Sequence, residues 1–485
     1  MSQAFPAIPF LSGNFAPLSF EADAHDLPVR GEVPRDLRGT LFRIGPNPQF
    51  APRDADYHWF IGDGMVHAFH VESGRVSYRN RWVQTPKYLA ERAAHRALHG
   101  SWGNPTTADP SVIGQDGGVA NTNIVHHAGK LLALEEQHPP FAVDAGTLAS
   151  QGYWDFAGAL AAGRFTAHPK IDPGTGEMVF FGYSVGGFFT TTIVWGVIDQ
   201  AGRLVRQEMF EAPYSAMLHD FLVTKNHVLF PIFPLTGSLE RAMAGQPAFA
   251  WEPEKGVHVG VMNRNGGAPT LRWFRCDPCY VFHGMNAYEE GNTLVAHVMQ
   301  YQAPPLFSDA SGVPLDSSET VARLHRWTFD LGAASDAFRR EPLDDLPADF
   351  PRLDERYSLH PYRHGYYAAA DGKKSAGVFD LLVHFDLETG KRALYRVAAG
   401  DAFSEPVFVP RGASAPAGDG YLLATIHRAA EKRSDFAIFD ASALEDGPLA
   451  LVELSHRVPF GFHGNWLDVH RAERERATSF GRYVG

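Results

Sequence analysis

Residues 280–298 read YVFHGMNAYEEGNTLVAHV, and this stretch decides the fold class. Two runs rich in Val, Tyr, Phe and Ala flank the turn residues EEGN at 289–292, which is the pattern of a β-hairpin. Similar patterns recur along the chain, with turn sequences DPGTGE at 172–177 and LETGK at 387–391. Such a series of hairpins predicts an all-β protein: a barrel, a sandwich or a propeller.

Chain length favours the propeller. The sequence has 485 residues, 45% of them hydrophobic and 20% charged, so it can bury a sizeable core. No long low-complexity linker interrupts it, and we expect one domain over residues 1–485. A sandwich rarely needs this length, whereas a propeller of several four-stranded blades does. Residues 87–98, KYLAERAAHRAL, follow Pro86 and have a helical period, which predicts a helical cap on the β body.

Composition excludes several classes. The formal net charge of −12 argues against a nucleic-acid partner. Residues 1–15 lack the basic and long apolar regions of a signal peptide, and no apolar run has the length of a transmembrane helix. The two cysteines, Cys276 and Cys279, indicate a reducing compartment, and we expect the cytoplasm. Their C-x-x-C spacing lacks a second pair of zinc ligands and a βαβ context, so we interpret them as two reduced thiols in a loop.

Four of the 23 histidines share a sequence environment of apolar residues, Gly and Pro. They are His168 in TAHPKIDP (166–173), His219 in MLHDF (217–221), His283 in FHGMNAYE (282–289) and His463 in FHGNW (462–466). Equivalent positions on different blades of a propeller converge on its axis. The four imidazoles are therefore candidate ligands of one metal ion, and imidazoles without thiolate suit Fe, Cu, Ni or Zn.

Three acids complete this pattern. Glu136, Asp349 and Glu405 lie in apolar or Pro-bounded segments, where an unpaired charge is costly. A metal-bound histidine usually donates its second ring N–H to such a carboxylate. The alternative for each acid is an exposed position at a strand edge.

The chain resembles the carotenoid cleavage oxygenases, in the broad sense that includes lignostilbene dioxygenases and isoeugenol or vinylphenol oxygenases. Besides the four histidine segments, the matching segments are LRGTLFRIGPNPQ (37–49), HWFIGDGMVHAFH (58–70), ANTNIVHHAGKLLAL (120–134), DFPRLDERY (349–357) and EPVFVPR (405–411). They follow the family's order from about residue 30 to residue 468.

This resemblance implies a seven-bladed β-propeller with a helical and loop cap over an axial metal site. It implies one Fe(II) ion held by the four histidines His168, His219, His283 and His463. It also implies hydrogen bonds from His219 to Glu136, from His283 to Asp349 and from His463 to Glu405. The family usually has Glu where this chain has Asp349, so a backbone shift or a water molecule must compensate for the shorter side chain.

The implied activity is that of a non-haem Fe(II) dioxygenase, which uses O2 to cleave a C=C bond into carbonyl products such as aromatic aldehydes. The sequence has no nicotinamide or flavin fingerprint, so the electrons must come from the substrate. Residues 81–105 resemble the stilbene and isoeugenol branch, whose members hold a phenol with a Phe, a Tyr and a Lys. Here these positions are Phe60, Trp102 and Glu135. Glu135 would repel a phenolate but accept a hydrogen bond from a phenol or act as a base toward it; alternatively it is salt-bridged away from substrate.

We therefore expect a phenylpropanoid-type alkene, such as a stilbene, isoeugenol or vinylguaiacol, as the substrate beside O2. A linear apocarotenoid is the alternative. A non-catalytic propeller that binds partners would need neither iron nor acids behind its histidines. A propeller hydrolase with Ca²⁺ would place carboxylate and amide oxygens on its axis instead of imidazoles. The sequence carries no indication of oligomeric state.

Overall fold

The computed structural model describes residues 4–53, 57–102, 104–160, 162–372 and 378–469. Contacts divide the chain into two compact units, which we call unit 1 (Met1–Ala157 and Val397–Gly485) and unit 2 (Gly158–Arg396). In the described residues, seven antiparallel sheets have four or more strands each. These sheets are the blades of a seven-bladed β-propeller, so the predicted fold class is confirmed. The prediction that residues 1–485 form a single domain stays a prediction.

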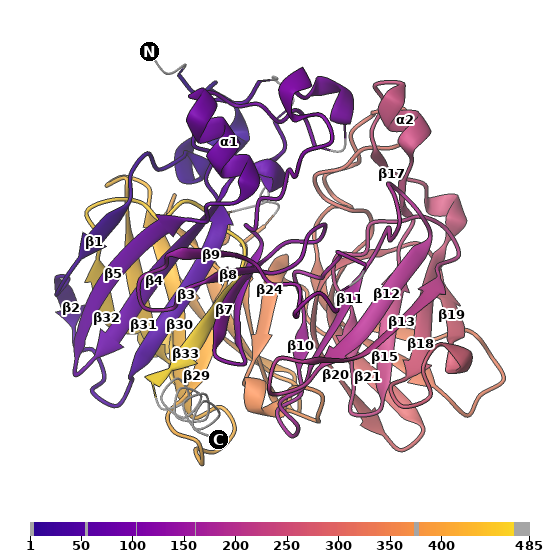
Figure 1. The fold of residues 1–485 in the computed structure, drawn as a ribbon. Helices are drawn as coiled ribbons and strands as arrows, with labels where there is room; N and C mark the ends of the chain where they lie inside the picture. Colours follow the sequence, from indigo (N-terminus) through magenta and orange to yellow (C-terminus); the bar gives the residue numbers. More distant parts are fainter. Residues whose placement is uncertain (1–3, 54–56, 103, 161, 373–377, 470–485) are drawn as a thin grey trace, which may run out of the picture. The chain divides into compact units, whose positions relative to one another are not determined.

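Unit 1 holds three of the blades (Figure 1). In order of pairing, the first contains β33 (Gly464–Asp468), β3 (Gly39–Pro46), β4 (Gly64–Glu72), β5 (Arg75–Trp82) and β1 (Ala22–Ala24). The second contains β6 (Asn123–His127), β7 (Lys130–Leu134), β8 (Phe141–Val143) and β9 (Ser150–Tyr153). The third contains β28 (Ala402–Phe403), β30 (Gly420–Arg428), β31 (Arg433–Asp440), β32 (Pro448–Glu453) and β2 (Val29–Gly31), with β29 (Val407–Pro410) also paired to β30.

Segments from both ends of the chain share sheets in unit 1. Strand β33 pairs with β3 in the register Gly39↔Asp468 to Arg43↔Gly464. Figure 1 shows this as a yellow strand beside an indigo one. Strand β2 likewise extends the C-terminal blade by pairing with β32. The N-terminal and C-terminal segments are therefore both needed to complete two of the three blades of this unit.

Alternation of side chains explains the sheets of unit 1. In β5, Val76, Tyr78, Asn80 and Trp82 are buried, and the residues between them are more exposed. This is the period of two that a half-buried strand requires. One core cluster joins the first and third blades through Phe69, Val76 and Ile438, among others. Each such buried side chain contributes about 1.5–3 kcal/mol to stability.

The one α-helix described in unit 1 is α1 (Pro86–Ala94), which is shorter than the predicted 87–98. Pro86 starts it as predicted, and the Thr85 side chain caps it by accepting the backbone N–H of Tyr88. It ends because His95 adopts the left-handed conformation with φ of 54°. The Glu91 carboxylate then accepts the backbone N–H groups that follow, those of residues 98 and 99, in place of helical carbonyls.

Unit 2 holds the other four blades and one small ribbon. The first two blades contain β10 (Lys170–Ile171), β11 (Met178–Gly182), β12 (Thr192–Ile198) and β13 (Leu204–Glu211), and then β14 (Leu222–Val223), β15 (His227–Ile232), β18 (Val257–Asn263) and β19 (Arg272–Cys276). The next two contain β20 (Tyr280–Glu290), β21 (Thr293–Tyr301), β22 (Arg323–Asp330) and β23 (Arg339–Pro342), and then β24 (Ala348–Leu353), β25 (His364–Ala369), β26 (Leu381–Asp386) and β27 (Lys391–Arg396). The ribbon pairs β16 (Leu235–Gly237) with β17 (Phe249–Trp251), next to helix α2 (Leu239–Met243).

Short 3-10 helices occupy several connections in both units. They are η1 (Pro9–Leu11), η2 (Gly13–Phe15), η3 (Trp59–Ile61), η4 (Pro105–Thr107), η5 (Pro110–Val112), η6 (Pro253–Lys255), η7 (Ala268–Thr270), η8 (Glu355–Tyr357) and η9 (Leu444–Asp446). Across the described residues, no helix combines the length and the hydrophobicity that crossing a lipid bilayer requires.

Candidate metal centre

Four buried histidines are the candidate metal ligands among the described residues: His168, His219, His283 and His463. Each belongs to a segment at the start of the edge strand of a blade. The strands are β10, β14, β20 and β33, in that order. The repeated position explains why all four lie in similar sequence segments, with apolar residues that pack into a blade edge.

In unit 2, three imidazoles meet. Nε2 of His168 lies 3.0 Å from Nε2 of His219, which lies 3.3 Å from Nε2 of His283. The ring centroids of His168 and His283 are 5.3 Å apart. Three ring nitrogens that face one another direct lone pairs at a common point, which is unfavourable unless a proton or a cation lies between them. The donor set therefore fits a transition metal of the kind that imidazole binds.

Strand β20 brings His283 to this point through irregular pairing. Its register with β21 shifts between Val281 and Gly284, and again between Gly284 and Asn286. A β-bulge redirects the side chains around it, and bulges are common beside functional sites. The bulge thus accounts for the presence of a polar histidine at a buried position of an otherwise regular hairpin.

Asp349 fixes the orientation of the His283 ring. Nδ1 of His283 lies 2.8 Å from Oδ1 of Asp349, and the Tyr301 hydroxyl donates to Oδ2 of the same carboxylate. Burial favours the neutral acid, but His283 and the hydrogen bonds from Tyr301 and Phe350 outweigh it and hold the pKa of Asp349 below its ordinary value. An ionised acceptor at Nδ1 keeps the proton on that nitrogen and leaves the Nε2 lone pair for a metal.

The shorter Asp reaches His283 directly, without the bridging water that the sequence left open. The register of β24 with β25 shifts between Asp349 and Arg352, and Phe350 has a φ of 56°. The Phe350 ring then stacks on His283, with 5.4 Å between the ring centroids. A local bulge in the backbone thus accompanies the loss of one methylene group relative to Glu.

In unit 1, Glu405 orients His463 in the same way. Nδ1 of His463 lies 2.8 Å from Oε1 of Glu405, and the backbone N–H of Gly464 donates to Oε2 at 2.8 Å. Buried Arg43 donates to the backbone carbonyls of Glu405 and Phe462, each at 3.0 Å. Arg43 lies within the segment LRGTLFRIGPNPQ (37–49), but sequence reasoning did not assign it a role.

Asp220 links the three histidine segments of unit 2, and sequence reasoning also missed it. Its Oδ1 accepts from Nζ of Lys170 at 2.6 Å and from the backbone N–H of Phe221 at 2.8 Å. Its Oδ2 accepts from the backbone N–H of Gly284 at 2.9 Å. Lys170, Asp220 and Gly284 follow His168, His219 and His283 by two, one and one residues. One buried carboxylate therefore ties together the three segments that carry these candidate ligands.

Glu136 is half-buried in unit 1. Its expected partner, His219, is in unit 2. Their hydrogen bond stays a prediction.

The residues expected to hold a substrate ring lie in unit 1. Trp102 stacks on His58, with 4.9 Å between the ring centroids, and meets Phe60 edge-on at 5.7 Å. Phe60 also packs edge-on against Phe462 at 5.7 Å, and Phe462 immediately precedes His463. Phe60 and Trp102 therefore form one aromatic cluster next to a candidate metal ligand.

Glu135 contacts a histidine instead of standing alone. Its Oε1 pairs with Nδ1 of His138, whose Nε2 lies 3.3 Å from Oδ1 of Asp116. The Tyr153 hydroxyl donates to that same Asp116 oxygen at 3.0 Å. His138 therefore links two half-buried carboxylates.

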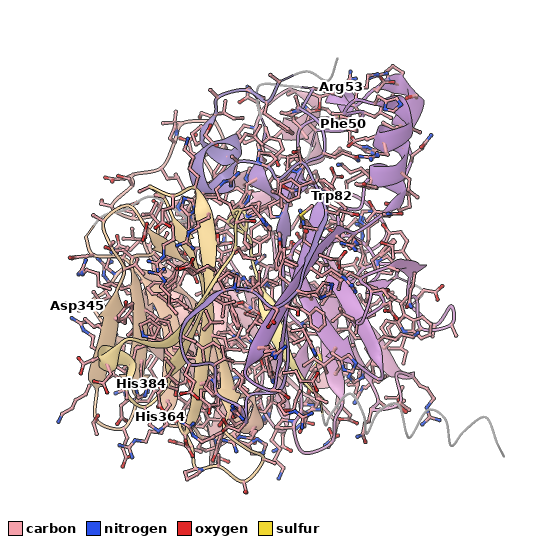
Figure 2. All side chains as sticks on the ribbon, turned by 90° about the vertical axis from the view of Figure 1, so that its left-hand side faces the viewer. Phe50, Arg53, Trp82, Asp345, His364 and His384 are labelled. Atoms are coloured by element: carbon pink, nitrogen blue, oxygen red, sulfur yellow. The ribbon has the colours of Figure 1, made fainter. Side chains whose placement is uncertain are left out.

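Other buried histidines show how context separates structural rings from candidate ligands. In β21, His297 is 1% exposed, but its Nδ1 contacts the Tyr362 hydroxyl at 2.9 Å and its Nε2 accepts from Arg326 at 3.2 Å. Burial, followed by the Arg326 charge, lowers the pKa of His297 to about 3. Both nitrogens of His297 are thus already occupied by protein groups. His364 and His384, labelled in Figure 2, contact each other in the same way, with 2.9 Å between Nδ1 of His364 and Nε2 of His384.

Comparison with known proteins agrees with the fold. The family model described as retinal pigment epithelial membrane protein matches residues 15–468. The chain is 40% identical over 468 residues to isoeugenol monooxygenase of Pseudomonas putida, covering 94% of this chain and 98% of that protein. It is 39% identical over 483 residues to lignostilbene-alpha,beta-dioxygenase isozyme III of Sphingomonas paucimobilis, covering 96% and 98%. It is also similar to the crystal structure of Pseudomonas brassicacearum lignostilbene dioxygenase, with a TM-score of 0.93, 36% identity and coverage of 96% and 100%.

Proposed function

Because this chain belongs to the family of retinal pigment epithelial membrane protein and the carotenoid oxygenases, we propose that it is a non-haem iron dioxygenase that cleaves an alkene. It uses O2 to convert the C=C bond of a phenylpropanoid-type substrate into two carbonyl products, without an external reductant. The observation that carries the proposal is the convergence of three buried imidazoles through their Nε2 atoms in unit 2.

The ligands we propose are His168, His219, His283 and His463, all buried, with the ion as Fe(II). Four neutral ligands would leave the full charge of the ion uncompensated. When bound, iron supplies the activation of O2, which no side chain can supply. The role of Asp349 and Glu405 is to hold the protons on Nδ1 of His283 and His463, so that both rings present Nε2. We propose the same role for Glu136 toward His219.

The substrate we propose is a 4-hydroxyphenyl alkene of the stilbene, isoeugenol or vinylguaiacol class. The names of the relatives support this class, since they act on isoeugenol and lignostilbene. Phe60 and Trp102 would flank the aromatic ring of the substrate, as their packing next to the His463 segment suggests. Glu135 would accept a hydrogen bond from the phenol O–H, with His138 holding the carboxylate in place.

The test is aerobic incubation of the iron-loaded chain with a panel of stilbenes, vinylphenols, isoeugenol and apocarotenals, with mass detection of aldehydes. We expect phenolic alkenes to be cleaved, and ¹⁸O2 to label both carbonyl products if both oxygen atoms are transferred. Cleavage of apocarotenals alone would favour the alternative substrate class. An iron-loaded chain that cleaves nothing in the panel would favour a non-catalytic scaffold.

His219→Ala tests the ligand assignment, and His297→Ala is its matched control. Both changes remove a buried imidazole from unit 2, but only His219 meets other imidazoles. We expect His219→Ala to lose iron binding and activity together, whereas His297→Ala keeps bound iron. A His219→Ala variant with full iron would refute the assignment.

Glu135→Lys and Glu135→Gln test the substrate contact. A Lys would attract a phenolate, whereas a Gln keeps a hydrogen-bond acceptor without the charge. We expect Lys to change the relative KM values among phenolic alkenes and Gln to change them less. Identical substrate profiles for all three proteins would place Glu135 outside the substrate site.

For the cellular location we propose the cytoplasm, because both cysteines are free.

A further inference from the structure

Cys276 and Cys279 are the only cysteines of the chain, and both are free thiols. Cys276 is the last residue of β19, and Cys279 directly precedes β20. Asp277 and Pro278 lie between them in the connection that joins two blades of unit 2. The pair therefore lies at the beginning of the strand that carries His283, although neither cysteine belongs to the histidine group.

The surroundings of the two thiols shift their pKa values in opposite directions. Burial raises the pKa of Cys279, but hydrogen bonding with Cys276 and the positive charge of Arg340 outweigh it, so the net pKa lies below that of an ordinary thiol. The hydrogen bond to Cys279, followed by burial, raises the pKa of Cys276. Cys279 is therefore the more readily ionised of the two thiols.

Cys279 also borders a pocket of about 570 Å³ on unit 2. Gln300, Gln302 and Arg340 line it with polar groups, and Pro278 lies on its wall. A small polar molecule can therefore approach the Cys279 side of the pair. Cys276 itself is half-buried, so the second thiol is not sealed in the core.

A zinc site does not account for the pair. In the described part of the chain, the histidine set is the one group in which three or more His, Cys, Asp or Glu residues lie close enough to share a metal ion. The two thiols therefore lack the third and fourth ligands of a structural zinc site.

We propose that Cys276 and Cys279 form a redox-active dithiol, which a hydroperoxide oxidises to an intramolecular disulfide and which thiol reductants restore. Cys279 is the attacking sulfur because it is the one beside Arg340 and the pocket. The inference is independent of the proposed alkene cleavage.

The chemistry balances with hydrogen peroxide as the oxidant. The Cys279 thiolate attacks one peroxide oxygen, so an S–O bond forms, the O–O bond breaks and the departing hydroxide takes up a proton to give water. The Cys276 sulfur then attacks the Cys279 sulfenic acid, so the S–S bond forms, the S–O bond breaks and a second water leaves with the Cys276 proton. Two thiols and one peroxide give one disulfide and two waters.

Thiol counting tests the proposal on the full chain. Under native conditions, hydrogen peroxide should remove both titratable thiols, and the peptide containing residues 276–279 should lose two hydrogen atoms in mass. Dithiothreitol should restore both. Two thiols that still titrate after treatment would overturn the proposal, and so would disulfide-linked dimers in place of an internal bond.

Variants separate the roles of the two cysteines and of Arg340. In Cys276→Ser, oxidation should stop at a sulfenic acid that dimedone traps, whereas Cys279→Ser should react slowly. Arg340→Met should slow disulfide formation about tenfold, which corresponds to a rise of about one unit in the pKa of the thiol. Arg339→Met is the matched control, because Arg339 is a solvent-exposed residue of the same strand that pairs with Glu341. Equal rates for the Arg339 and Arg340 variants would refute the assigned role of Arg340.

Discussion

Asp220→Asn is the sharpest test of how unit 2 holds its imidazoles. All partners of the Asp220 carboxylate are donors: Nζ of Lys170 and two backbone N–H groups, those of Phe221 and Gly284. An Asn side chain has one acceptor oxygen and one NH2 group. Whichever way the amide turns, at least one buried donor faces another donor.

The magnitude follows from these contacts. If the amide oxygen keeps Lys170 and Phe221, the Gly284 N–H loses its acceptor, which costs about 1–3 kcal/mol. The bond from Lys170 also changes from one between charged groups to one with a neutral acceptor, which costs about 1 kcal/mol more. We expect Asp220→Asn to lower the free energy of unfolding by about 2–4 kcal/mol. Because Gly284 follows His283, we also expect the metal affinity to fall by about 10- to 100-fold.

Asp172→Asn is the matched control. Asp172 is likewise buried, accepts from the Arg264 guanidinium at 3.1 Å, and accepts the backbone N–H groups of Gly174 and Thr175. We expect a similar loss of stability from it, but an unchanged metal affinity, because none of these residues adjoins a histidine of the group.

The assay has two independent readings. Urea unfolding of the metal-free proteins gives the change in stability, and anaerobic titration with Fe(II) or Co(II) against a chelator gives the affinity. The reasoning fails if Asp220→Asn binds metal as tightly as the parent protein. It also fails if both variants lose affinity equally, since the effect would then follow from general destabilisation.

Three further changes test other parts of the molecule. Hydrogen bonds overcome burial and hold the pKa of Glu289 at about 2. The stabilisation from this carboxylate is therefore present above its unfolded pKa of 4.5 and disappears as the pH falls toward 2. Above pH 5, Glu289→Gln should lower the free energy of unfolding by up to about 3 kcal/mol, a difference that should vanish near pH 2 in urea titrations. Asp349→Ala removes the acceptor of the His283 N–H, so chelator competition should show iron affinity lower by about 10- to 100-fold, and an unchanged affinity would count against its orienting role. Gly45→Ala would place a Cβ 2.4 Å from the backbone of Gly461 and should cost about 1–3 kcal/mol in urea unfolding, whereas Gly412→Ala, which meets nothing within 4 Å, should cost little.

The sequence allowed the fold class and the histidine set to be predicted because each rests on a local pattern. Hairpin turns such as those at 172–177 and 289–292 specify strand pairs whatever the tertiary context. Each of the four histidines lies in a short, mostly apolar segment, and His168, His283 and His463 stand next to Gly or Pro, which helped to separate them from the other 19. His297, in the run TLVAHV, has a similar apolar setting, and only its contacts with Tyr362 and Arg326 mark it as structural.

What sequence reasoning missed depends on distant contacts. The end of α1 at Ala94 depends on a left-handed His95, which no helical period reveals. The direct bond of Asp349 depends on a bulge in β24, and the Asp220 linkage depends on segments about 50 and 64 residues away. Side-chain reach and backbone register decide such contacts, and neither is written in a single stretch of residues.

Pairing of β33 with β3 has a consequence for biosynthesis. Residues 39–43 are translated some 420 residues before their partner strand. The nascent chain must therefore keep one flank of β3 unpaired until β33 emerges from the ribosome, and His463 emerges directly before that strand. A transcript that stops before codon 463 would yield a polypeptide with neither β33 nor the fourth candidate ligand.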